Sequence, residues 1–135
     1  MANIEELRDT RIKKLNILKD AGMDPYPARV VRDLSLLDLR SQFETYVEKG
    51  EAQSVVGRIM AIRGQGAILF VVLDDGTDRF QTVFKKDTIE EELFTLFTDA
   101  IDIGDFIEVA GVPFTTDRGE KSILVNKWAI VTKSL

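Results

Sequence analysis

The chain has 135 residues, of which 44% are hydrophobic and 30% are charged. It contains no cysteine and no histidine, which excludes disulfides, thiolate nucleophiles, zinc sites built on those residues and a Ser-His-Asp triad. No apolar run approaches the ~20 residues that span a bilayer and no signal pattern opens the chain, so we expect a cytoplasmic domain without a membrane partner. The net charge of −5 disfavours a non-specific nucleic-acid binder, which is normally basic. If the chain binds nucleic acid, it must therefore do so through a local site that reads bases.

The chain begins with a predicted amphipathic helix over residues 3–22. Apolar side chains recur there three or four positions apart, Asn3 is placed to cap the start of the helix, and Gly22 suits its end. The segment Asp24-Pro25-Tyr26-Pro27 then stops any helix, because each proline biases its predecessor toward an extended conformation.

A second helix is predicted over residues 35–49, with Ser35 as its cap and Gly50 just beyond its end. Together the two helices make residues 1–50 an N-terminal helical extension. We expect them to pack against the next domain or tether it, and the basic side chains of the first helix offer an alternative role along a phosphate backbone.

Residues 51–135 change to the period of β-structure and form the second predicted domain. The predicted strands are 54–62, 67–73, 79–84, 106–115 and 121–132, with a helix at 87–97. Gly57 and Gly111 lie inside strands and mark the tight bends or bulges of a small barrel. This order predicts a mainly β fold: a five-stranded Greek-key barrel of the OB-fold class, with a helix between strands three and four and two helices before the barrel.

Four side chains are candidates for a base-reading site on the open face of strands two and three. Phe70 lies in the middle of strand two, and alternation places it opposite the core-facing residues. Gln81 offers a donor and an acceptor that match the edge of uracil, Arg63 offers a forked cation, and Glu120 can accept from a base N–H. Each residue also has a structural interpretation: a core ring, a solvated amide, a surface cation and a turn acid.

Other motifs carry no chemistry that we can identify. Gly64-x-Gly66 opens a strand and not a helix, so it is not a dinucleotide-binding fingerprint. The acidic runs at 74–75 and 90–92 lack companions at metal-ligand spacing and indicate a hairpin turn and a helix start. We therefore predict no catalytic residue and no metal site.

Several short segments, in this order and spacing, resemble the N-terminal anticodon-binding domain of bacterial class II lysyl-tRNA synthetases over essentially the whole chain. They are Arg11-Ile12-x-Lys14-Leu15, Gly22-Met23-Asp24-Pro25-Tyr26-Pro27, Gly57-Arg58-Ile59-Met60-Ala61-Ile62-Arg63-Gly64, Phe84-Lys85-Lys86-Asp87, Gly104-Asp105-Phe106-Ile107, Gly119-Glu120-x-Ser122 and Thr132-Lys133-Ser134-Leu135.

The resemblance implies a role for each candidate. Phe70 matches the ring that stacks on the middle anticodon uridine, Gln81 and Arg63 match residues that hydrogen-bond anticodon uridines, and Glu120 matches the acid near the first anticodon base. The implied partners are the anticodon loop of lysine tRNA and the catalytic domain of the same synthetase, which forms a homodimer in this family.

The same resemblance implies that ATP, Mg²⁺ and aminoacyl transfer belong to a catalytic domain outside these residues. We therefore expect no cofactor and no catalytic activity in this chain alone, as a fragment of a lysine–tRNA ligase. The alternatives are a stand-alone OB-fold module that binds single-stranded nucleic acid and one that binds proteins.

Overall fold

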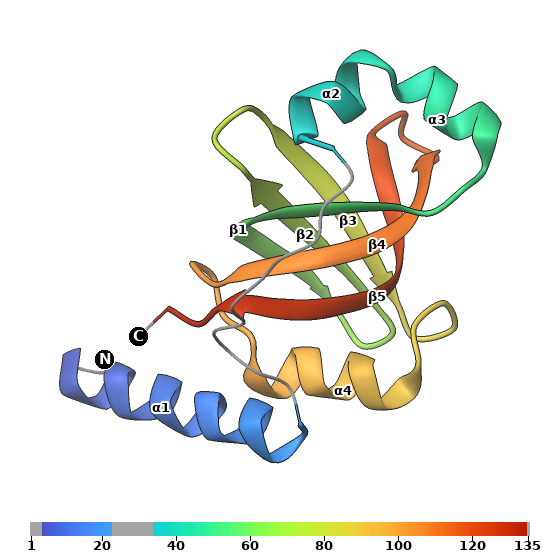
Figure 1. Ribbon diagram of the computed structural model, residues 1–135. Coiled ribbons are helices and arrows are strands. Elements are labelled where there is room, and N and C mark those ends of the chain that lie inside the picture. The colour runs from blue at the N-terminus through green and yellow to red at the C-terminus, as the bar shows by residue number, and fades with distance from the viewer. Residues whose placement is uncertain (1–3, 23–33, 135) are drawn as a thin grey trace.

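Five strands close into a barrel at the centre of the computed structural model, which describes residues 4–22 and 34–134 (Figure 1). The strands are β1 (Gln53–Gln65), β2 (Ile68–Asp74), β3 (Arg79–Lys85), β4 (Phe106–Thr115) and β5 (Lys121–Thr132). Their order around the barrel is β1-β2-β3-β5-β4, in which only the β3–β5 pair is parallel. The predicted OB-fold class is confirmed, with a helix after β3 and helices before β1. The predicted cap Asn3 and the turn at 24–27 lie outside the described residues.

Strand β1 closes the barrel by pairing with two neighbours. Its first half pairs with β4 and its second half with β2, and the register shifts between Ile59 and Ala61. Gly57 lies where a Cβ would stand 3.0 Å from the Cβ of Leu73. Gly111 lies closer still, because a Cβ there would stand 2.2 Å from the carbonyl oxygen of Leu124, and the β4–β5 register shifts beside it. A side chain at Gly111 would force the two strands apart.

Helix α4 (Glu91–Ala100) closes one end of the barrel with its buried phenylalanines. The ring of Phe97 stands 4.3 Å from that of Phe84 and 5.4 Å, edge-on, from that of Trp128, measured between centroids. The helix begins later than the predicted 87–97, because the preceding residues are tied to the barrel: the Thr88 hydroxyl donates to the Val125 carbonyl at 3.1 Å, and Ile89 is buried.

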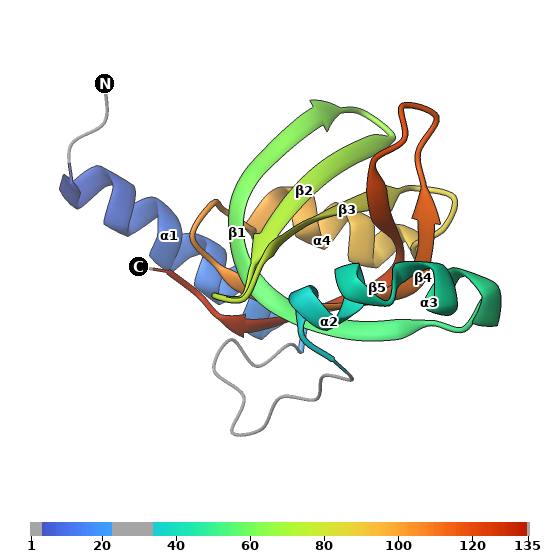
Figure 2. The ribbon, with the colours of Figure 1, turned by 90° about the horizontal axis from the view of Figure 1, so that it is seen from above.

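Two short helices, α2 (Leu36–Ser41) and α3 (Phe43–Lys49), cover the other end of the barrel (Figure 2). The prediction of one continuous helix over 35–49 was wrong at Gln42, whose φ of −118° breaks it. The Ser41 hydroxyl donates to the Leu37 carbonyl at 2.8 Å, a contact that bends helices. The predicted caps are confirmed, since Ser35 accepts from the Asp38 amide and Gly50 adopts a left-handed φ of 64°.

Helix α1 (Ile4–Asp20) lies beside α4 and buries Leu15 and Leu18 (Figure 1). Leu18 belongs to the same buried cluster as the barrel residues, as do Leu36, Leu39 and Phe43 of the other N-terminal helices. Among the described helices, none has the length and apolar character that crossing a lipid bilayer requires.

Candidate nucleic-acid interface

Strand β2 presents Phe70 on the outer face of the barrel. Leu69, Val71 and Leu73 are buried in the core, whereas Phe70 and Val72, which alternate with them, are only half-buried. This is the arrangement that alternation along the strand predicts. The ring is therefore accessible and not enclosed by aliphatic neighbours.

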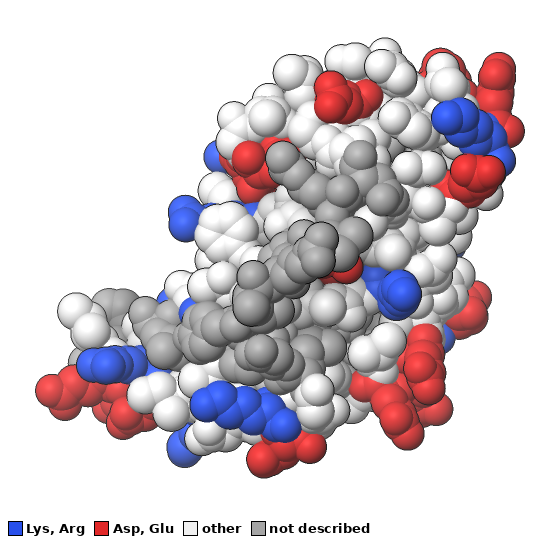
Figure 3. All heavy atoms as spheres, in the orientation of Figure 1, with Lys and Arg blue, Asp and Glu red and all other residues white. Residues whose placement is uncertain are grey.

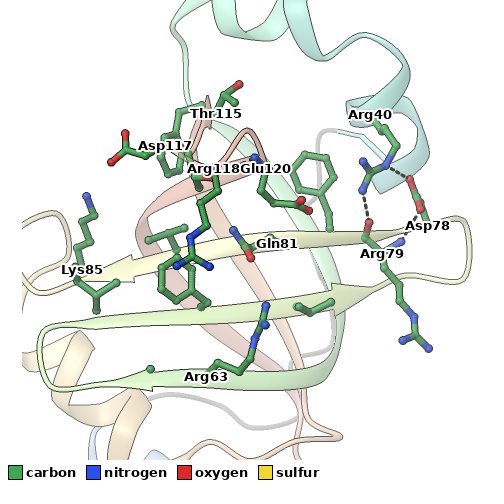
Figure 4. A pocket seen from close by; sticks show the side chains of 18 residues that line it. Arg40, Arg63, Asp78, Arg79, Gln81, Lys85, Thr115, Asp117, Arg118 and Glu120 are labelled. Carbon is green, nitrogen blue, oxygen red and sulfur yellow. Dashed lines mark hydrogen bonds and ion pairs between the residues drawn. The ribbon is translucent and has the colours of Figure 1, made fainter.

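A groove of about 1110 Å³ lies over this face, between β2 and β3 on one side and the hairpin that joins β4 to β5 on the other (Figure 4). All four residues singled out from the sequence line it: Arg63, Phe70, Gln81 and Glu120. The Cα of Arg63 pairs with that of Phe70 across β1 and β2, and Gln81 pairs with Val72, two residues further along β2. The structure thus brings an aromatic ring, a guanidinium, an amide and a carboxylate to one site.

The amide of Gln81 is held in place from behind. Its Nε2 donates to the hydroxyl of the buried Ser122 at 3.0 Å, and that hydroxyl donates to the carbonyl oxygen of Glu120 at 3.3 Å. No side-chain group of the described residues donates to the Gln81 amide oxygen. One acceptor and the second N–H of the amide therefore remain available to a ligand in the groove.

The groove also carries basic side chains that were not singled out from the sequence. Besides Arg63, its lining includes Arg40, Arg79, Lys85 and Arg118. Figure 4 shows Arg118 coming from the β4–β5 hairpin toward Gln81, while Arg63 approaches from β1. The only sequence signal for Arg118 was its position in the turn before Glu120. That position predicts a place in the groove only once the β4–β5 hairpin is known to border it.

At one end of the groove the basic side chains are already neutralised. Arg40 of α2 pairs with Asp78, and the Arg79 Nε lies 3.0 Å from an Asp74 carboxylate oxygen. The hydrogen bond from Arg40, followed by one from the Arg79 amide, holds the pKa of Asp78 below its ordinary value. These pairs link the acidic β2–β3 turn to α2 and to the start of β3.

The same turn anchors helix α2. One carboxylate oxygen of Asp75 accepts from the Leu36 amide at 2.9 Å, and the other accepts from the Thr77 amide at 2.9 Å. Although burial alone would raise the pKa of Asp75, these hydrogen bonds together hold it below its ordinary value. The turn thus fixes α2, and with it Arg40, at the edge of the groove.

Much of the remaining acidic charge lies elsewhere. Glu90, Glu91 and Glu92 are exposed where α4 begins, and Figure 3 shows acidic side chains on that part of the surface. In the two described ranges, no three acidic side chains come together where they could hold a metal ion. The net charge of the chain therefore gives a poor picture of the local charge in the groove, where five basic side chains stand against three acidic ones.

Comparison with known proteins agrees with this description. Residues 53–131 match the family model described as an OB-fold nucleic acid binding domain. The chain is 32% identical over 98% of its length to a lysine–tRNA ligase of Thermotoga maritima, 37% over 94% to lysine–tRNA ligase 2 of Methanosarcina acetivorans, and 37% over its whole length to a lysine–tRNA ligase of Prochlorococcus marinus. It covers 27%, 25% and 29% of those proteins, respectively.

The closed five-stranded barrel is that of the OB-fold class, and the family match is in accord. The chain belongs to the family of OB-fold nucleic acid binding domains. Within that family it is similar, over nearly all its residues, to part of lysine–tRNA ligases.

Proposed function

We propose that this chain is the anticodon-binding domain of a lysine–tRNA ligase and recognises the uridine-rich anticodon of lysine tRNA in the cytoplasm. The observation that carries the proposal is the convergence of Arg63, Phe70, Gln81 and Glu120 on one groove. Its similarity to lysine–tRNA ligases supports the choice of tRNA. An OB barrel binds single-stranded nucleic acid on the β2–β3 face, which is where the groove lies.

Each side chain has a distinct task in this proposal. Phe70 stacks on an unstacked anticodon base, a contact that contributes about 1–3 kcal/mol per base. The free amide oxygen of Gln81 accepts from N3–H of uracil, and its second N–H donates to a uracil carbonyl. In a cytosine held in the same position on Phe70, the N3 acceptor would face the Gln81 oxygen in place of the uracil N3–H, so this hydrogen bond would be lost. Arg63 binds a base carbonyl or a phosphate, and Glu120 accepts from the N–H of a neighbouring base.

We further propose that the catalytic work of such a ligase lies outside this domain. The chain spans about a quarter of the length of the lysine–tRNA ligases that it matches. ATP, Mg²⁺, lysine activation and the contacts of a homodimer would then belong to the catalytic domain, and these residues would contribute tRNA specificity without a cofactor and without catalytic activity of their own.

The test measures the affinity of this chain for an unmodified lysine-tRNA anticodon stem-loop and for loops in which the middle base is changed. We expect binding at least about tenfold tighter to the uridine loop, because a mismatched edge loses its hydrogen bonds to the Gln81 amide and leaves the oxygen of that amide without a partner. Gln81→Met should reduce this preference, whereas Gln53→Met, on the part of β1 that pairs with β4, should preserve it. Equal affinity for all loops would contradict base reading.

One observation favours a second candidate. Ile68 is 40% exposed and lines the groove with Phe70 and Val72, an apolar strip that a protein partner could also cover. A stand-alone OB-fold module for proteins or for any single strand would lack the preference for uridine. Loss of a protein contact in Phe70→Ala, with RNA binding intact, would support the protein-binding module.

A further inference from the structure

Arg118 lines the groove with a side chain that has no acidic partner. It lies in the turn between β4 and β5, is exposed, and points toward Gln81 in Figure 4. No ion pair or hydrogen bond engages its guanidinium among residues 4–22 and 34–134. No ion pair joins it to the nearby Asp117, whose carboxylate points away from Gln81 in the same view. Five N–H donors therefore border the groove without an acceptor.

The turn that carries Arg118 is held by its own backbone. The Thr116 amide donates to the Glu120 carbonyl at 2.9 Å, and the Gly119 amide donates to the Thr116 carbonyl at 2.8 Å. The Glu120 amide donates to the Thr116 hydroxyl at 3.1 Å, and Gly119 supplies the positive φ of 87° that the turn requires. The base of the Arg118 side chain is thus fixed over the groove before any ligand arrives, which lowers the entropy cost of binding.

The unpaired cations are unevenly distributed along the groove. Arg40 and Arg79 are engaged by aspartates at one end, whereas Arg63, Lys85 and Arg118 have no ion pair among the described residues. Figure 4 shows Arg63 and Arg118 approaching the middle of the groove from opposite walls. Two guanidinium groups that face each other across an open groove are best satisfied by an anion with several acceptor oxygens.

We propose that Arg118 binds a backbone phosphate of the RNA strand in the groove, next to the nucleotide that stacks on Phe70 and across from Arg63. This inference rests on the proposed function, since it requires single-stranded RNA at this site. A phosphate contact positions the strand without carrying sequence information. Arg118 is therefore expected to supply affinity in a chain whose net charge opposes RNA, while Gln81 supplies the discrimination.

The experiment compares Arg118→Ala with Lys127→Ala, which removes the same charge from an exposed position on β5 that does not line the groove. Binding of the uridine and cytidine stem-loops is measured between about 50 and 300 mM salt. We expect Arg118→Ala to weaken both loops about threefold to tenfold and to lower the slope of log affinity against log salt by about 0.7, the share of one phosphate contact. Arg118→Lys should keep most of that slope, and Lys127→Ala should match the unaltered chain.

The two measurements separate this inference from the proposed function. Preference for uridine in the unaltered chain tests base reading, and the salt slope tests Arg118. Equal slopes for Arg118→Ala and Lys127→Ala would overturn the phosphate contact, and so would a loss of base preference in Arg118→Ala at an unchanged slope. Absence of RNA binding by the unaltered chain at low salt would overturn both. Urea midpoints of the variants establish that each remains folded.

Discussion

Basic side chains near the two ends of strand β5 lie in opposite environments, one exposed and one buried. At its start, the groove holds Arg63 and Arg118, which are exposed and have no acidic partner in the described part of the chain. Just beyond its end, Lys133 is buried and binds two carboxylates, with its Nζ 2.6 Å from Asp105 and 2.8 Å from Asp102.

This second region, which we call the Lys133 cluster, comprises Lys133, Asp105, Asp102 and Lys14. Lys14 of α1 pairs with Asp102, so the cluster ties α1 to the turn before β4 and to the segment after β5. All four of its charged groups form ion pairs within the protein and stabilise the fold. Pairing, more than residue type or net charge, therefore distinguishes a structural cation from one that can bind a ligand.

The largest expected effect comes from breaking the Lys133 cluster. Lys133→Met leaves the carboxylate of Asp105 buried without its cation, and breaking a buried pair in this way costs about 3–5 kcal/mol of unfolding free energy. Urea unfolding measures the loss. Lys127→Met, on the exposed face of β5, should change stability by less than about 0.5 kcal/mol. A Lys133→Met chain as stable as the control would show that the cluster contributes little to the fold.

A smaller effect, on binding instead of stability, is expected at the groove. Phe70→Ala should weaken binding of the uridine stem-loop by about 1–3 kcal/mol, because it removes the stacking surface. Fluorescence anisotropy of a labelled loop measures this loss. Phe106 is the matched control, since its ring is also half-buried but contacts Arg58 outside the groove. Equal losses in Phe70→Ala and Phe106→Ala would mean that Phe70 acts through the fold and not through stacking.

Local sequence patterns predicted the barrel and one wall of the groove. The strands over 106–115 and 121–132 were placed correctly, because turn residues bound them and β-rich patterns fill them. Alternation around Phe70 was enough to predict which face of β2 is buried. Both features depend on residues that are close in sequence, and there periodicity is informative.

Features that depend on distant segments were missed. Arg40 and Arg118 reach the groove only because α2 docks on the β2–β3 turn and the β4–β5 hairpin folds over β3. The Lys133 cluster likewise joins residues that are at least 28 positions apart, except within its Asp102–Asp105 turn. Periodicity within a segment carries no information about contacts with distant segments. The long-range ion pairs and the second wall of the groove could therefore be identified only from the tertiary structure.

The smallest expected effect is the pH dependence of the Lys133 cluster. Burial would raise the pKa of Asp102, but the hydrogen bonds from Lys133 and Lys14 outweigh it and hold that pKa below its ordinary value of 3.8. A carboxyl group with a lowered pKa in the folded state stabilises the fold above its unfolded pKa, and the stabilisation is lost as the pH falls through the folded value. The loss is therefore expected below about pH 4.

Asp102→Asn isolates this contribution, because the amide keeps the shape of the side chain and does not titrate in this range. From pH 7 to about pH 5 the unaltered chain should be more stable than Asp102→Asn by a constant amount, on the order of 0.5–1 kcal/mol for partly exposed ion pairs. Below about pH 4 the difference should shrink, because protonation of Asp102 removes the charge in the unaltered chain as well. Urea midpoints of both chains across this range measure the difference. A difference that stays constant or grows in acid would show that the hydrogen bonds of Asp102, and not its charge, hold α1 to the barrel.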